Sequence, residues 1–206
     1  MLSVECCCTS CRTAGGVLAK LPGAPRIVGR NTATHLVLYR KDRIHFTKGA
    51  ELLKEYRLTP ESATRRIIAI CCNTPIVLDF TKGHWLSLYS CLWSAHTLPP
   101  IQMRTMTSDA LEGTILSDDV PNHKRYAFSF FAKLLSAWVA MGSKYRKSSS
   151  TERSTPDADD KDCNLRRKAQ MHGTLARGRG RFVSCPVGER RLEFRELPFA
   201  TGSNGE

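Results

Sequence analysis

Three cysteines near the start of the chain, Cys6, Cys8 and Cys11, have a spacing that can hold a metal ion. Zinc in proteins takes about four ligands, and each thiolate sulfur lies roughly 2.3 Å from the ion. Side chains alternate sides in an extended segment, so Cys6 and Cys8 share one face while Cys7 points away. A turn at residues 9–10 then brings Cys11 to the same ion. The spacing predicts a three-thiolate zinc site, although copper(I) and iron–sulfur clusters also bind thiolates.

The number of cysteine ligands separates a structural site from a catalytic one. A closed structural zinc has four protein ligands, whereas a catalytic zinc keeps one position open for water or substrate. An exogenous thiol can fill the open position. From the spacing alone, the predicted metal ligands are Cys6, Cys8 and Cys11. The sequence identifies no general acid or base and no separate cofactor-binding residue.

The distribution of all nine cysteines also favours metal over disulfides, because six of them fall in two clumps, at 6–11 and 71–72. Neighbouring cysteines do not easily meet the geometry of a disulfide bridge. The start of the sequence shows no secretory signal. Reduced buried thiols are the plain alternative to a metal site. We expect reduced cysteines in an intracellular protein, in the cytoplasm in preference to the nucleus.

The elements that must position these cysteines are mostly strands. Short runs rich in β-branched, aromatic or alternating apolar residues lie at 35–39, 44–47, 65–71, 76–80 and 84–93. Residues with turn chemistry separate these runs. Many short strands punctuated by turns predict a mainly β domain.

One helix is predicted near residues 123–141, with Asn122 as its N-cap and Gly142 as its stop. Its apolar face is broad, and packing on the β domain is favoured over partner or membrane binding. The segment 144–206 is polar and basic, which predicts a flexible, disordered tail. The chain is thus divided into a zinc-binding β domain with a docked helix at 1–143 and a basic tail.

Charge indicates which partners suit the chain. The net charge is +12, which attracts anions such as nucleic acid, acidic lipid or glutathione. Arg65 and Arg66 are placed to meet a carboxylate, and residues 177–181 form a short RG segment of a kind that can bind RNA. No apolar run approaches the roughly 20 residues of a membrane span, so no membrane partner is expected.

Several short motifs resemble one known family. The run CCCTSCR at 6–12, followed by AGG at 14–16, resembles the catalytic-zinc segment of the glutathione-dependent formaldehyde-activating enzyme and centromere protein V family. FTKG at 46–49 resembles the family's F-x-x-G step, and CNTP at 72–75 resembles its C-G-T-P turn. The order of these motifs is closest to an uncharacterised branch, over about residues 5–90.

This resemblance implies a β-tent fold, in which small antiparallel sheets surround zinc. The founding members are carbon–sulfur lyases that join formaldehyde to glutathione and carry a structural and a catalytic zinc. For this chain it implies a small-thiol substrate, such as S-hydroxymethylglutathione, at Cys6, Cys8 and Cys11. No C-x-C precedes Cys6, and Ala69 interrupts the later C-x-x-C that ends at Cys72. Either the fold dispenses with the structural zinc, or Cys72 turns inward to become the fourth ligand of the remaining one.

Two functions therefore follow from the sequence. The first is a carbon–sulfur lyase that acts on a thiol adduct at a three-cysteine zinc. The second is a non-enzymatic module, stabilised by zinc, that binds nucleic acid through its basic surface and RG segment.

Overall fold

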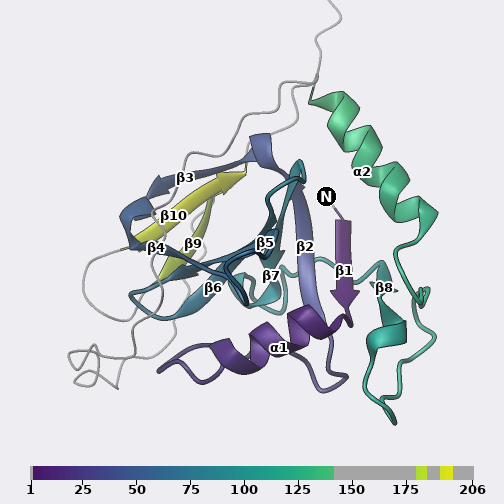
Figure 1. Cartoon of the computed structure of the whole chain (residues 1–206). Helices are drawn as coiled ribbons and strands as arrows, with labels where there is room; N and C mark the ends of the chain where they lie inside the picture. Colours follow the sequence, from purple (N-terminus) through teal and green to yellow (C-terminus); the bar gives the residue numbers. More distant parts are fainter. Residues whose placement is uncertain (1, 142–179, 185–190, 197–206) are drawn as a thin grey trace, which may run out of the picture.

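The computed structural model describes residues 2–141, 180–184 and 191–196 of the chain (Figure 1). Its strands are β1 Leu2–Cys6, β2 Thr34–Arg40, β3 Ile44–Lys48, β4 Leu53–Tyr56, β5 Thr64–Ala69, β6 Thr74–Phe80, β7 Trp85–Tyr89, β8 Met103–Thr105, β9 Gly180–Ser184 and β10 Arg191–Glu196. The helices are α1 Thr9–Leu18 and α2 Phe128–Ala140, with 3₁₀ turns at Lys41–Arg43, Ala50–Leu52, Ser90–Leu92 and Thr107–Asp109. The prediction of a mainly β fold is confirmed.

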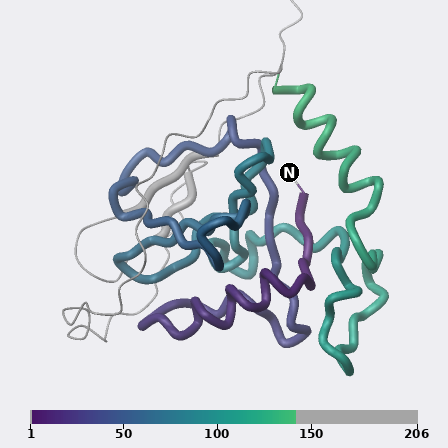
Figure 2. The backbone as a smooth tube through the Cα atoms, viewed as in Figure 1, coloured from purple at the N-terminus to yellow at the C-terminus, as the bar shows by residue number. Residues whose placement is uncertain are grey.

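One seven-stranded sheet organises the fold, in the order β4-β5-β6-β7-β2-β1-β8. Its neighbours pair antiparallel except β1 and β8, which run parallel. The tube in Figure 2 shows the N-terminal strand β1 beside β2. From the end of β1 the chain continues into α1. The other strands form a three-stranded sheet in the order β3-β10-β9, so one large and one small sheet stand where the resemblance implied several small sheets.

Apolar side chains pack on both faces of this sheet because strand residues alternate between faces. In β2, Leu36 and Leu38 belong to one buried cluster, while Val37 and Tyr39 belong to another. The first cluster also contains Cys6 and Cys11 and the α2 residues Phe130 and Leu134. The cysteines therefore sit inside one of the two halves of the core.

Helix α1 was not expected, because residues 9–10 were predicted only as a turn. The segment instead begins a ten-residue helix whose N-cap is Cys8. Two adjacent glycines, Gly15 and Gly16, lower the helix propensity of this stretch and hide it from sequence analysis. Gly15 is nonetheless required by packing, since a Cβ atom there would stand 2.2 Å from Cγ2 of Val28.

Helix α2 exists as predicted, but its start and its packing differ from the prediction. Its N-cap is Ala127, and the amide of Asn122 donates to the Ser117 carbonyl instead of capping a helix. Only Phe130 and Leu134 of this helix are buried. The expected docking of the whole apolar face is therefore wrong, and most of that face is exposed.

Among the described residues, neither helix has both the length and the apolar character that a membrane crossing requires.

Strands β9 and β10 fall inside the segment that was predicted to be a disordered tail, and for these strands that prediction is wrong. β10 pairs antiparallel with β9 on one side and with β3 on the other. The sequence of β10, RLEFRE, alternates apolar and polar residues, which is a strand pattern masked by its polar surroundings. The other residues of the predicted tail lie outside the described residues, and so do residues 177–179 of the RG segment.

Candidate metal centre

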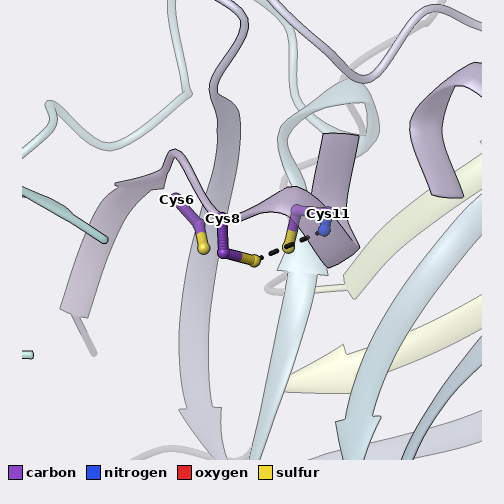
Figure 3. Close-up of side chains that lie close together, drawn as sticks. All are labelled: Cys6, Cys8 and Cys11. Carbon is purple, nitrogen blue, oxygen red and sulfur yellow. Dashed lines mark hydrogen bonds between the residues drawn. The ribbon is translucent and has the colours of Figure 1, made fainter. Parts of the chain in front are cut away.

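Cys6, Cys8 and Cys11 come together as predicted, and their Sγ atoms all lie within 4.8 Å of one another (Figure 3). Cys6 and Cys11 are buried, while Cys8 is partly exposed. Sulfurs bound at roughly 2.3 Å to one tetrahedral zinc stand about 3.8 Å apart. The three positions therefore fit a single thiolate-bound metal ion with little rearrangement.

The change from strand to helix positions these sulfurs. Cys6 ends β1 and is held between Thr34 of β2 and Thr105 of β8. Cys8 remains extended, with φ −65° and ψ 149°, and caps α1. Its Sγ accepts a hydrogen bond of 3.3 Å from the backbone N–H of Cys11 (Figure 3). A sulfur therefore occupies the position where a hydroxyl or carboxylate oxygen usually caps a helix.

Cys7 points away from the other three cysteines, as the strand geometry predicts. It is fully buried and does not belong to the sulfur group. Its N–H donates to the carbonyl of Thr105 at 3.0 Å, and its own carbonyl accepts from Nη1 of Arg12 at 3.2 Å. Arg12 also donates to the carbonyl of Asp109 at 2.9 Å. Arg12 thus clamps the backbone around the site.

Without a metal, the three thiols share their protons unequally. Hydrogen bonds from Cys11 and Cys6 hold the pKa of Cys8 far below the usual thiol value. Hydrogen bonds to Cys6 and Cys8, together with burial, raise the pKa of Cys11. For Cys6, the hydrogen bond with Cys11 lowers the pKa, but the one with Cys8 and burial raise it to about 12. The group accepts one negative charge readily and needs a cation to hold more.

A buried arginine lies against this group. Arg66 of β5 is fully buried, and its Nη2 donates to the carbonyl and the Oγ of Ser10, at 3.2 and 3.0 Å. Its charge contributes to the low pKa of Cys8. Its Nε and Nη1 have no hydrogen-bond partner among the described residues. A guanidinium in this position is costly unless negative charge stands nearby, and the thiolates of the centre supply it.

Two tyrosines border the same region. Tyr89 is buried in the cluster that contains Cys6 and Cys11, and burial raises its pKa despite the nearby charge of Arg66. Tyr126 is about half exposed, and burial followed by the three cysteines raises its pKa. Sequence analysis missed both, because no local pattern connects them with cysteines so far away in the chain.

Arg65, the neighbour of Arg66, has a different role. Its Nε lies 2.8 Å from Asp79, and its Nη1 lies 3.1 Å from Glu55. Asp79 also lies 2.8 Å from Nζ of Lys41. The carboxylates that Arg65 meets are thus side chains of the chain itself and not those of a bound ligand. Arg65 therefore has the carboxylate partner that its sequence position suggested, within a network that ties β4, β5 and β6 together.

Cys72, the fourth residue of the predicted set, is not brought to the other three. Its Sγ lies 3.1 Å from Oγ1 of Thr74 and 3.8 Å from Sγ of Cys71. It packs against the core cluster on the other face of the sheet from Cys6 and Cys11. Cys71 is disulfide-bonded, which differs from the expectation that all cysteines are reduced. The structure thus groups three cysteines and leaves Cys72 apart.

The turn that carries Cys72 nevertheless explains one detail of its sequence. Asn73 has a φ of 52°, in the left-handed region. Glycine and asparagine adopt this conformation at the least cost. The Asn73 amide also donates to the carbonyl of Pro22 at 2.9 Å. Asparagine is therefore a physically sound replacement for the glycine of the C-G-T-P turn.

Comparison of the chain with known proteins found no matching family model, no matching curated protein and no matching solved structure. The family resemblance therefore depends on the sequence motifs alone. The geometry by itself supports a narrower statement, that three close cysteines can hold a metal ion.

Proposed function

We propose that Cys6, Cys8 and Cys11 bind one zinc ion and leave its fourth position to a ligand from outside the chain. The supporting observation is the group of three sulfurs within 4.8 Å that does not include Cys72. Partial exposure of Cys8 gives an incoming ligand a route to the centre. Three protein ligands with one open position are typical of catalytic rather than structural zinc.

The function that this centre supports best is carbon–sulfur chemistry on a small thiol, such as the adduct of glutathione with formaldehyde. In the forward direction the thiol sulfur bonds to the carbonyl carbon, and the thiol proton ends on the former carbonyl oxygen. The reverse reaction breaks the same carbon–sulfur bond. A zinc ion in this position supplies a lowered thiol pKa and a polarised oxygen. The motifs at 6–16 and 72–75 that resemble formaldehyde-activating enzymes favour this chemistry over others, as does a β fold around the centre.

Within this proposal, the chain's own residues hold and shield the site. Arg66 balances thiolate charge from the buried side, and Arg12 fixes the backbone between strand and helix. Tyr126, about half exposed, lines the approach. The intracellular location expected from the sequence stays a prediction: thiolate ligands persist best in a reducing compartment, whereas the disulfide at Cys71 is favoured by an oxidising one.

The test is two-dimensional exchange NMR of glutathione and formaldehyde with zinc-loaded full-length protein. Exchange cross-peaks between glutathione and its hydroxymethyl adduct should grow faster than without protein. Cys8→Ser should return the exchange rate to the uncatalysed value. An uncatalysed rate with fully zinc-loaded wild-type protein would exclude the lyase reaction while leaving the metal site intact.

The alternative is a zinc-stabilised module that binds nucleic acid, which the net charge of +12 favours. Binding through phosphate contacts weakens steeply as salt increases. Fluorescence anisotropy with labelled RNA and DNA across a salt series measures this slope directly. Loss of binding on deletion of residues 144–206 would assign it to that segment, and absence of binding at low salt would exclude the alternative.

A further inference from the structure

Helix α2 presents a continuous apolar stripe to solvent. Five large apolar residues on it are exposed at spacings of three or four along the helix or next to each other: Phe128 at 88%, Phe131 at 53%, Leu135 at 59%, Trp138 at 43% and Val139 at 64%. Such spacing places them on one side of a helix. The buried Phe130 and Leu134 attach the helix to the body by a neighbouring side. The exposed stripe is therefore the part of the broad apolar face of α2 that does not pack on the body of the protein.

Basic residues precede and follow this stripe along the sequence. From Val120 to Thr151 the sequence contains no aspartate or glutamate and six basic residues: Lys124, Arg125, Lys133, Lys144, Arg146 and Lys147. Lys124, Arg125 and Lys133 lie within the described residues and are exposed. An apolar stripe flanked by lysine and arginine, with tryptophan and phenylalanine on the apolar side, is the pattern of a helix that lies in a membrane interface.

We propose that α2 docks in the plane of an anionic lipid surface, with the stripe in the headgroup and acyl boundary and with Lys124 and Arg125 against lipid phosphates and carboxylates. Helix α2 has thirteen residues and lies along the edge of the molecule, where one long side faces away from the sheet (Figure 1). Docking of this kind does not cross the bilayer. It therefore differs from the membrane span that the sequence excludes, and the expectation of no membrane partner considered only the length of apolar run that a span requires.

Other occupants fit these observations less well. A second copy would bring the same basic residues against one another, since no acidic residue in 120–151 offsets them. Nucleic acid would satisfy the charge but would leave Phe128, Leu135 and Val139 without an apolar partner. Anionic lipid satisfies both the apolar stripe and the positive charge.

The test is sedimentation of full-length protein with phosphatidylcholine vesicles and with mixed phosphatidylcholine and phosphatidylserine vesicles. Wild-type protein should bind the mixed vesicles at least about 25-fold more tightly, because Lys124 and Arg125 near an anionic surface each contribute about fivefold. The paired variant Phe128→Ser, Leu135→Ser should weaken this binding at least about tenfold, because each apolar side chain withdrawn from water contributes at least that factor. Lys124→Gln, Arg125→Gln should reduce the preference for phosphatidylserine about twentyfold.

A matched control keeps the test specific to the helix. Ile115 is 90% exposed and lies outside α2, so Ile115→Ser should bind vesicles as wild type does. Circular dichroism of the α2 variants should match wild type, because the substituted side chains are exposed. Equal sedimentation with both vesicle types, or unchanged binding by the Phe128→Ser, Leu135→Ser variant, would overturn the proposal. A concentration-dependent dimer that this variant abolishes, without vesicle binding, would overturn it in favour of a second copy.

Discussion

The two cysteine clumps, at 6–11 and 71–72, differ in whether their sulfur atoms come together in the fold. At the first, Cys6, Cys8 and Cys11 converge because a strand end passes directly into a helix N-terminus. At the second, Cys71 and Cys72 lie in the turn between β5 and β6, and the Sγ atom of Cys72 lies 3.1 to 3.9 Å from Thr74, Cys71 and Ala69. The difference shows that a metal site depends on the direction of the backbone around the cysteines as much as on their number.

Local charge separates the two clumps further. The first has a fully buried guanidinium, Arg66, whose charge lowers the pKa of Cys8. The pKa of Cys91, which packs against the cluster that contains Cys6 and Cys11, is raised to about 12, first by burial and also by the charge of Cys72. The first clump therefore favours one thiolate, at Cys8, while the pKa values of Cys6 and Cys11 are raised as that of Cys91 is.

The largest expected effect is loss of metal from the first clump alone. Cys8→Ser should lower the zinc content from about one ion per chain to less than about 0.2, because hydroxyls bind zinc far more weakly than thiolates. Cys72→Ser is the matched control at the second clump and should leave the zinc content unchanged. Inductively coupled plasma mass spectrometry of purified protein gives both numbers. Equal loss of zinc in the two variants would erase the distinction between the clumps.

The next largest effect tests the charge difference. Arg66→Met should weaken zinc affinity by about 10–100-fold, the usual effect of losing a partner that supports the ligands. Arg66→Lys keeps the charge and should recover part of that loss. Ser10→Ala, which removes only the side-chain acceptor of Arg66, serves as the control and should change affinity little. Competition with a chromophoric chelator measures the affinities, and an unchanged value in Arg66→Met would refute the role assigned to this charge.

A smaller effect should appear in the strands that carry the second clump. Burial alone would raise the pKa of Glu55, but hydrogen bonds from Arg57 and Arg65 lower it below the usual glutamate value. This carboxylate therefore stabilises the fold above the pKa of an unfolded glutamate, and the contribution is lost as pH falls through the lower folded pKa. Glu55→Gln should cost about 2 kcal/mol of unfolding free energy near pH 7.

Urea denaturation followed by circular dichroism measures this cost at several pH values. The difference between wild type and Glu55→Gln should shrink as pH falls below about 4. Zinc affinity near pH 7 should not change, since Glu55 belongs to the ion-pair network of β4, β5 and β6. A pH-independent difference would show that Glu55 acts through packing and not through charge.

The smallest effect concerns Cys7, which stands between two ligands but is not one of them. It is fully buried and faces away from the sulfur group. Cys7→Ala should cost about 1 kcal/mol through a small cavity and leave zinc stoichiometry at the wild-type value. Thermal unfolding and metal analysis of this one variant check both statements, and zinc loss comparable with Cys8→Ser would reassign the ligands.

Sequence analysis succeeded where the pattern is local. The alternation of side chains along an extended segment correctly separated Cys7 from Cys6 and Cys8. It failed for α1, because Gly15 and Gly16 lower the helix propensity of this segment. The glycine at position 15 is explained by its close packing against Val28, which the sequence does not show. It failed for β10 because an alternating run of six residues looks like part of its polar surroundings.

The residues around the candidate metal site could not be predicted from short sequence patterns, because they are distant from the cysteines in the chain. Arg66 reaches the cysteines from β5, and Tyr126 reaches them from the segment before α2. Contacts between residues so far apart in the chain depend on the strand order, which short-range patterns do not specify. The contrast between Arg65 and Arg66 shows the same limit, since adjacent arginines of one strand point to opposite faces and meet different partners.

Zinc K-edge X-ray absorption of the zinc-loaded full-length protein tests the central claim most directly. Three cysteine ligands with an open position predict three sulfur neighbours at about 2.3 Å and one oxygen or nitrogen neighbour at about 2.0 Å. Addition of a small thiol should replace the light atom by a fourth sulfur. Four sulfur neighbours before any thiol is added, reduced to three by Cys72→Ser, would contradict the account and make the site structural.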